Sequence, residues 1–186
     1  MGKQFVSMSH QHIEFIEQQQ LFFVATAAAQ GKVNVSPKGM DSFRVLNSQQ
    51  VLWLNLTGSG NETAAHVQQL PRMTVMFCAF QGKPLILRLY GQATAIHRAD
   101  EAWQDYISMF PAQAGARQIF LLEIEMVQGS CGLSVPFFDF VGPRDELSSW
   151  AEKQGERGIE QYWAKKNQRS LDGVATHIVN LSKPAT

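Results

Sequence analysis

Two short segments of the chain combine the hydroxyl, amide and cationic groups that bind phosphorylated ligands. Ser36-Pro37-Lys38-Gly39 offers a hydroxyl, a cation and a backbone amide next to a proline, which cannot donate to a β-ladder. Thr57-Gly58-Ser59-Gly60-Asn61-Glu62-Thr63 offers hydroxyls and amides just ahead of a helical pattern, and the unpaired amides at a helix N-terminus attract anions. One hypothesis is therefore a phosphate held between the two segments.

The same residue types are also common in turns that bind no ligand. Neither segment has the spacing of a Walker loop or of a Rossmann fingerprint, and neither stands in a β-α-β unit. On these residues alone, a phosphate site and a pair of ordinary turns both remain open.

Other reactive residue types form weaker patterns. His66 and His97 are isolated, which is more typical of packed or surface histidines than of catalytic ones. Glu123 and Glu125 share one face of a strand, which gives no support to catalysis by paired carboxylates. Cys131 has no base or cation beside it in the sequence, and the two cysteines have no CxxC spacing. We therefore expect neither a disulfide scaffold nor a structural metal.

Length and composition favour one domain. The 186 residues are 45% hydrophobic and 17% charged, which suits a single domain over 1–186, with a core at about 12–128 and a helical extension at about 143–170. Basic and acidic residues number 16 each without a basic run, so we expect no nucleic-acid partner. The first twelve residues lack a signal-like apolar stretch and no later run could span a bilayer, so we expect a cytoplasmic protein without a membrane partner.

Hydrophobic patterning predicts the elements that must position the two segments. Strands are predicted at 21–26, 33–36, 43–46, 51–56, 73–80, 85–96 and 119–127. Helices are predicted at 10–20, 62–70, 100–110 and within 145–168. We expect a bend at Ser36-Pro37-Lys38-Gly39, and Asn61 or Ser59 as the N-cap of the second helix. Strands that do not alternate regularly with helices favour a mainly β fold with helices (α+β), a six-stranded closed or split β-barrel.

The order of these pieces resembles the pyridoxamine 5′-phosphate oxidase-like flavoproteins over Phe15 to about Val127. The pieces are Phe22-Phe23-Val24-Ala25-Thr26, Val33-Asn34-Val35-Ser36-Pro37-Lys38-Gly39, Val51-Leu52-Trp53-Leu54, Asn61-Glu62-Thr63-Ala64-Ala65-His66, Pro71-Arg72-Met73-Thr74-Val75-Met76-Phe77 and Leu87-Arg88-Leu89-Tyr90-Gly91-Gln92-Ala93. The resemblance implies an FMN-binding split β-barrel and a homodimer with FMN, or sometimes another flavin or haem, at the subunit interface.

The resemblance also implies which residues hold the cofactor. Those along the flavin would be Ser36, Pro37, Lys38 and Gly39, and those near the ribityl chain and phosphate would be Thr57, Gly58, Ser59, Asn61 and Thr63. Arg88 would face the same site from either subunit. The apolar segment 131–138 would either close over the flavin ring or pack beneath the C-terminal helices, whose Trp150, Tyr162 and Trp163 we expect in the core or a dimer contact.

Two departures from the family pattern bear on function. Where authentic pyridoxamine phosphate oxidases carry a basic pair, this chain has Asn61-Glu62-Thr63, so phosphate binding would depend on Lys38, Arg44 or Arg88. The segment Leu171-Asp172-Gly173-Val174-Ala175-Thr176-His177 has no Arg-x-His substrate motif, so we do not expect oxidation of pyridoxamine phosphate.

These observations lead to one main expectation and two alternatives. We expect an FMN-dependent oxidoreductase with a small-molecule substrate or a nicotinamide reductant; because flavins supply the redox chemistry, no catalytic residues are assigned. The first alternative is a non-catalytic flavin or haem carrier on the same fold. The second is a ligand-free interaction domain.

Overall fold

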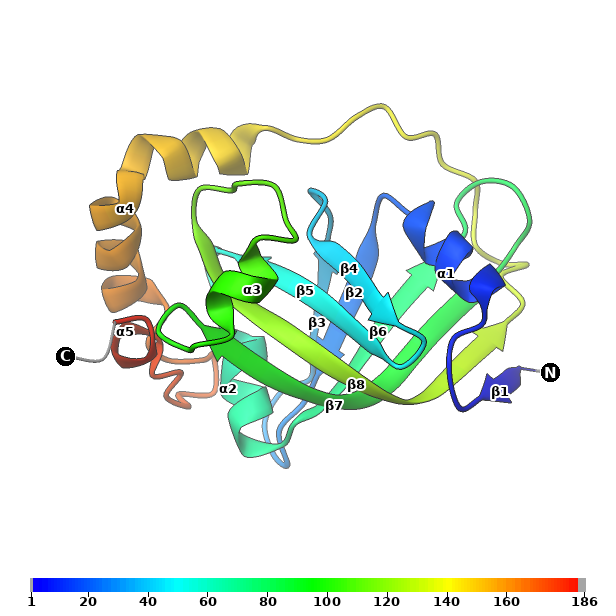
Figure 1. Ribbon diagram of the computed structural model, residues 1–186, viewed down its shortest axis with the longest axis horizontal. Helices are drawn as coiled ribbons and strands as arrows, with labels where there is room; N and C mark the ends of the chain where they lie inside the picture. Colours follow the sequence, from blue (N-terminus) through cyan, green and yellow to red (C-terminus); the bar gives the residue numbers. More distant parts are fainter. Residues whose placement is uncertain (1, 184–186) are drawn as a thin grey trace.

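One antiparallel sheet organises the computed structural model, which describes residues 2–183 (Figure 1). Its strands are β1 (Lys3–Phe5), β2 (Phe22–Thr26), β3 (Asn34–Lys38), β4 (Phe43–Asn47), β5 (Gln50–Leu56), β6 (Arg72–Cys78), β7 (Ile86–His97) and β8 (Ala116–Ser130). The helices are α1 (His10–Glu17), α2 (Glu62–Gln69), α3 (Trp103–Ile107), α4 (Glu146–Lys166) and α5 (Ile178–Leu181). None of the helices in this part of the chain is long and apolar enough to cross a membrane.

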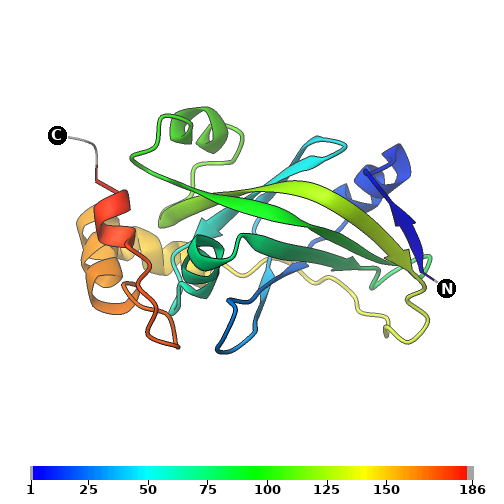
Figure 2. The same cartoon turned by 90° about the horizontal axis from the view of Figure 1, so that it is seen from below.

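The strands follow the order β3-β2-β6-β7-β8-β5-β4, and β1 pairs with the end of β8. The sheet is strongly curved but does not close (Figure 2), so the expected mainly β fold with helices is confirmed as a split barrel. The expected number of six strands was too low, because all seven strand-like segments are strands and β1 adds an eighth. The three residues of β1 are all exposed, so no hydrophobic alternation marks this strand in the sequence.

The long strands β7 and β8 pair along almost their whole length and form the middle of the sheet. A bulge separates Tyr90 from Gly91, and there the β8 backbone comes very close. A Cβ on Gly91 would lie 1.8 Å from the carbonyl oxygen of Glu123. Only glycine therefore fits in β7 at this bulge in its pairing with β8.

The bend expected at Ser36-Pro37-Lys38-Gly39 was wrong in position. Strand β3 continues through Pro37 to Lys38, because β3 is an edge strand and the missing amide hydrogen of proline costs no ladder bond there. The chain instead reverses at Met40 and Asp41, whose φ angles are 62° and 51°. The regular strand places Asn34, Ser36 and Lys38 on one face.

Strand β5 is buried on both faces, which explains its uninterrupted apolar sequence. Val51 and Trp53 belong to the cluster that packs against α1 and α2. Leu52 and Leu54 belong to a second cluster, which packs against Trp103 of α3. The predicted first helix is confirmed by α1, which begins after a capping box at Ser9. The core thus lies on both sides of the sheet around β5.

The C-terminal helices lie at the end of the sheet away from the N-terminus (Figure 1). Helix α4 confirms the prediction within 145–168 and kinks at Gly155, where φ is 61°. Trp163 is 1% exposed and its indole Nε1 donates to Thr57 Oγ1 at 2.8 Å, so the predicted burial of this tryptophan is confirmed. This hydrogen bond ties the end of α4 to the loop that follows β5.

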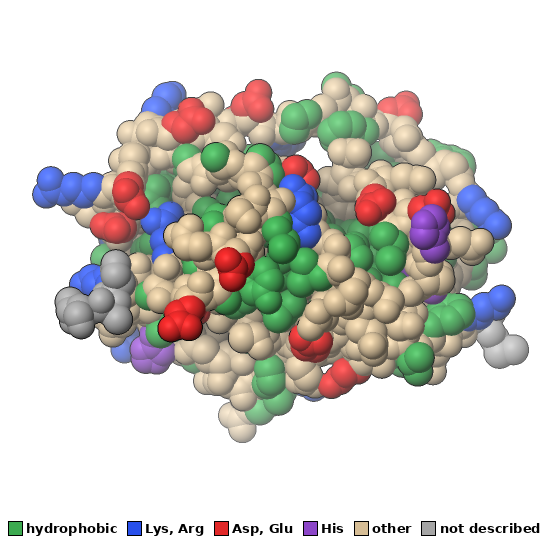
Figure 3. Space-filling view, viewed as in Figure 1, with side chains coloured by type: hydrophobic (Ala, Val, Ile, Leu, Met, Phe, Trp, Pro, Cys, Tyr) green, Lys and Arg blue, Asp and Glu red, His purple; other side chains and the backbone are tan. Residues whose placement is uncertain are grey.

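The loop between β8 and α4 runs along one edge of the molecule in an extended course (Figure 1). Leu133, Phe137 and Val141 are 79%, 81% and 100% exposed. For Leu133 and Phe137, packing of segment 131–138 beneath the C-terminal helices, one of the two alternatives, was therefore wrong. Figure 3 shows acidic and basic side chains intermingled on the face in view, without a large patch of one sign.

Candidate functional site

A cavity of about 540 Å³ opens where β3, β5, the first turn of α2 and the C-terminal segment meet. Its walls come from parts of the chain that are far apart in sequence. The lining residues are Asn34, Ser36, Lys38, Trp53, Asn55, Leu56, Gly58, Ser59, Gly60, Asn61, Glu62, Thr63, Arg117, Arg169, Ser170 and Leu171. The two segments singled out in the sequence therefore share one cavity, with Lys38 and Ser59 both on its wall.

A chain of side-chain hydrogen bonds links β3 to α2 across this cavity. Ser36 Oγ donates to Asn34 Oδ1 at 3.3 Å, and Asn34 Nδ2 donates to Thr63 Oγ1 at 3.4 Å. These contacts depend on the unbroken strand, because its two-residue period turns Asn34, Ser36 and Lys38 to the same side. The continuation of β3 past Pro37 is thus what brings the lysine into the cavity.

Lys38 is held in the cavity as a largely buried cation. Its Nζ lies 5.0 Å from the centre of the Trp53 ring, a cation–π contact. Burial, and to a smaller extent repulsion from Arg117, lowers the pKa of Lys38 to about 8. The amine is therefore in an environment that disfavours its charge unless an anion lies beside it.

Arg117 is the main site residue that the sequence did not reveal. It lies on β8, is 3% exposed, and burial lowers the pKa of its guanidinium. Nη1 donates to the carbonyl of Gly60 at 3.0 Å and to Asn167 Oδ1 at 2.7 Å, while Nε donates to Gln118 Oε1 at 3.1 Å. The only sequence signal was a single arginine just before a predicted strand, which is too common to identify a site.

No ion pair within residues 2–183 includes Lys38 or Arg117. A partly buried lysine and a buried arginine that face one cavity without an ion-pair partner are costly, because each has lost water and has no carboxylate in contact. A bound anion would remove this cost. The electrostatics of the cavity therefore fit an anionic ligand.

Asn61 gives a second, independent indication that the cavity binds a polar ligand. It is the N-cap residue of α2 and lines the cavity, but it is 2% exposed and both Nδ2 and Oδ1 lack a hydrogen-bond partner. Buried polar atoms are almost always hydrogen-bonded. A ligand with both acceptor and donor oxygens, such as a phosphate next to a hydroxylated chain, would satisfy this amide at a helix N-terminus.

Several residues proposed from the sequence do not line this cavity. Thr57 is 1% exposed, and its hydroxyl already donates to Gly115 O and accepts from the Trp163 indole. Pro37 points to solvent on the other face of β3, and Gly39 follows the strand without reaching the cavity wall. Arg88 lies on β7, where its Nη1 donates to Ser130 Oγ at 3.1 Å.

The other charged and histidine candidates are occupied elsewhere. Arg44 pairs with Asp41 and donates to Met109 O, so it is not free for a ligand in the cavity. His66 is buried and shares a hydrogen bond of 3.1 Å with Thr26, in agreement with the expectation of a packed histidine. Across the described residues, no group of three or more His, Cys, Asp or Glu side chains is arranged to hold a metal ion.

Comparisons with known proteins agree with the fold, and the matched family model covers the cavity residues from Asn34 to Arg117. The family model described as pyridoxamine 5′-phosphate oxidase matches residues 8–131. The pyridoxamine 5′-phosphate oxidase family protein ustO of Aspergillus flavus is 37% identical over 186 aligned residues, which span 90% of this chain and 75% of that protein.

Solved structures show the same fold at lower sequence identity. One is a putative pyridoxamine 5′-phosphate oxidase from Lactobacillus delbrueckii, with a TM-score of 0.54 and 18% identity over 66% of this chain and 94% of that one. Another is HupZ from Group A Streptococcus, with a TM-score of 0.51 and 19% identity over 64% of this chain and 91% of that one. The long family match and the closely similar relative together establish that this chain belongs to the pyridoxamine 5′-phosphate oxidase family.

Proposed function

We propose that this chain is an FMN-dependent oxidoreductase that holds the FMN phosphate at the N-terminus of α2. The observation that carries the proposal is the convergence of Lys38, Arg117 and the unpartnered Asn61 amide on one cavity. A phosphate monoester carries about −1.5 to −2 charges at pH 7, which would neutralise both cations. Bound FMN supplies the redox chemistry, and the protein supplies binding, orientation and charge.

The remaining wall of the cavity suits the other parts of the same ligand. The hydroxyls of Ser36, Ser59 and Thr63 offer donors and acceptors for a ribityl chain. Trp53 and Leu56 contribute apolar surface. The Trp53 ring stacks on Phe120, with 4.9 Å between the ring centres, which fixes its position. The mixture of cations, hydroxyls and apolar surface is what a phosphorylated aromatic cofactor requires.

The substrate is proposed to be something other than pyridoxamine phosphate. Arg169 lines the cavity, but the residue two positions later is Leu171, so no histidine completes an Arg-x-His pair there. A small-molecule substrate or a nicotinamide reductant would have to reach the flavin through the open side of the cavity.

A haem carrier on the same fold receives less support from the cavity. Iron in haem proteins is ligated by His, Cys, Met or Tyr. None of these four types is among the residues that line the cavity in the described part of the chain. A flavin carrier without turnover has the same cavity requirements as the oxidoreductase, so kinetics must separate the two.

We also propose that the chain forms a homodimer. The edge strand β3 begins beside Val33, which is 70% exposed, and its Val35 is 60% exposed. The loop between β8 and α4 exposes Leu133, Phe137 and Val141 in addition. Adjoining exposed apolar side chains are typical of protein contacts, and Val33 and Val35 lie two residues apart at the β3 edge. Sedimentation velocity tests this proposal: Val35→Lys with Phe137→Asp should shift a dimer to monomer, and a monomeric wild-type chain would contradict it.

Purification followed by titration with FMN tests the function. The flavin fluorescence should be quenched with a 1:1 stoichiometry, and a protein that neither carries flavin nor binds added FMN would refute the proposal. Anaerobic addition of NADH or NADPH, followed by oxygen, then tests turnover. Repeated bleaching and recovery of the flavin absorbance indicates an oxidoreductase, whereas a flavin that stays oxidised with both nucleotides indicates a carrier or another reductant.

A further inference from the structure

The segment of residues 168–177, here called the C-terminal strap, forms one wall of the cavity. Arg169, Ser170 and Leu171 line the cavity from this segment. The strap hangs below the C-terminal helices beside the turn between β2 and β3 (Figure 2). Because its Leu171 amide bonds to Glu62, the first residue of α2, the strap lies next to the proposed phosphate position.

Contacts on two separate elements hold the strap in place. The backbone amide of Leu171 donates to the Glu62 carboxylate, with distances of 2.9 and 3.1 Å to its two oxygens. The Asp172 carboxylate accepts from Lys32 Nζ at 2.6 Å and from the Lys32 amide at 2.8 Å. Glu62 is the first residue of α2 and Lys32 lies in the β2–β3 turn, so the strap is tied both to the cavity wall and to the neighbouring turn.

The strap also has an internal structure of its own. Arg169 pairs with Ala175 in an isolated bridge, and the Ser170 amide donates to Val174 O at 2.8 Å. Gly173 supplies the turn with a φ of 79°. Gln68 of α2 donates to Thr176 O at 2.8 Å and fixes the far end. A short hairpin with both ends anchored is preorganised, so displacing it has a cost that a ligand must overcome.

We infer that the C-terminal strap makes the cavity selective for mononucleotide flavin, FMN, over the dinucleotide FAD. The inference rests on the proposed function. FAD extends FMN by an adenylate group on its phosphate, so the extension must leave the cavity from the phosphate end. At that end, Leu171 is bonded to Glu62 within the first turn of α2, so the adenylate would meet the strap.

The charge of the cavity favours the same ligand. The terminal phosphate of FMN carries up to about two negative charges on one group. Lys38 and Arg117 are close enough for the charge of Arg117 to lower the pKa of Lys38. In FAD each of the two phosphates is a diester with about one negative charge, so the phosphate beside Lys38 and Arg117 would carry less charge than that of FMN.

Fluorescence titrations with FMN and with FAD test the inference on the full chain. We expect wild-type protein to bind FMN at least about tenfold more tightly than FAD. Asp172→Ala removes both bonds to Lys32 and should lower this ratio about threefold or more, because the strap is released on one side. The double variant Asp172→Ala with Glu62→Ala should bring the ratio close to one. Asp105→Ala on the exposed side of α3 is the matched control and should leave the ratio unchanged.

Lys32→Ala breaks the same ion pair from the other partner, so it provides the test if Asp172→Ala does not fold. Equal wild-type affinities for FMN and FAD would overturn the strap inference while leaving flavin binding intact. The same conclusion follows if wild type prefers FMN but the ratio does not change in Asp172→Ala, Lys32→Ala or the double variant. A chain that binds no flavin would overturn both the proposed function and the inference.

Discussion

The amine of Lys38 lies 5.0 Å from the centre of the Trp53 ring, although the two residues belong to β3 and β5, which are far apart in the strand order of the sheet. The strands β2, β6, β7 and β8 all stand between them along the hydrogen-bonded order. The sheet must therefore curl until the β3 edge faces β5. That curl creates the cavity, and the open seam of the split barrel is where a ligand can enter.

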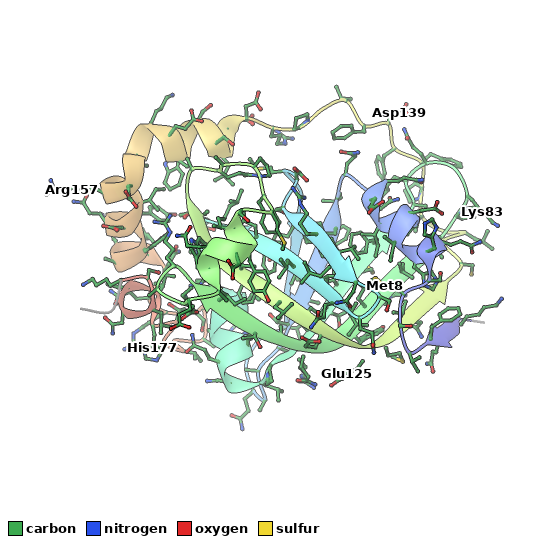
Figure 4. All side chains as sticks on the ribbon, viewed as in Figure 1. Met8, Lys83, Glu125, Asp139, Arg157 and His177 are labelled. Carbon is green, nitrogen blue, oxygen red and sulfur yellow. The ribbon has the colours of Figure 1, made fainter. Side chains whose placement is uncertain are left out.

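Replacement of Lys38 by Ala should weaken FMN binding about tenfold to a hundredfold, since a charged hydrogen-bond partner of the phosphate contributes about 1.5–3 kcal/mol. Lys38→Arg should retain most of the affinity. Arg157→Ala is the control: Arg157 projects from α4 into solvent (Figure 4), and its loss should leave the dissociation constant unchanged. Full affinity in Lys38→Ala would mean that the flavin binds elsewhere.

FMN binding should weaken as the pH rises. Burial and Arg117 lower the pKa of Lys38 to about 8, so the ligand-free protein loses this positive charge above that pH. Between pH 7 and pH 9 the affinity should fall about tenfold, because the phosphate, with a second pKa near 6, keeps its charge. Lys38→Arg should show a change of only about twofold, since a guanidinium stays protonated.

The stability of the ligand-free protein should respond to pH in the opposite direction. The folded pKa of Lys38 lies below its ordinary value of 10.5, so between about 8 and 10.5 the unfolded chain binds more protons than the folded one. The contribution of Lys38 to the free energy of unfolding therefore increases as the pH rises through that window. Urea denaturation of wild type and Lys38→Met at pH 7.5 and 9.5 measures the contribution, and an equal pH response in both proteins would contradict it.

Thr57→Val should destabilise the protein without a comparable loss of FMN affinity. The substitution leaves the buried Trp163 indole without its hydrogen-bond partner, while the Gly115 carbonyl keeps the Thr57 backbone amide, and the loss costs about 1–3 kcal/mol of unfolding free energy. Because the Thr57 hydroxyl is already used in these contacts, we expect the FMN dissociation constant to stay within about threefold. A large loss of affinity at unchanged stability would instead assign Thr57 to the ligand.

Gly91→Ala should destabilise the sheet severely, by about 3 kcal/mol or more, because its Cβ would lie 1.8 Å from the Glu123 carbonyl oxygen. Gly129→Ala is a matched control on the neighbouring strand. Its Cβ would meet nothing closer than Leu85 Cδ1 at 3.9 Å, so we expect a change within about 1 kcal/mol. Thermal melting of both variants decides the point; similar melting temperatures would show that the two strands can separate at the bulge.

The sequence by itself determined the order and type of most elements. Strands β5 to β7 and helix α2 follow from apolar runs and from turn residues such as Pro71. The spacing of apolar residues along a short segment is enough to indicate a strand or a helix. It also determined that the segments at Lys38 and Ser59 could bind phosphate, since hydroxyl, amide and cation are properties of the residues themselves.

Other features were decided only by the tertiary structure. Pro37 predicts a bend in isolation, but the edge position of β3 removes the cost of its missing donor, and edge position is a property of the whole sheet. Thr57 has the chemistry of a ligand contact, yet Trp163, 106 residues later, uses its hydroxyl.

Arg117 shows the same dependence most clearly. Its residue type and neighbours resemble any arginine at the start of a strand, and nothing local separates it from Arg88 or Arg44. Only the folding of β8 against the α2 loop and the C-terminal segment buries it without a carboxylate. A local sequence reports what a side chain can do, whereas its desolvation and its partners depend on contacts between distant segments.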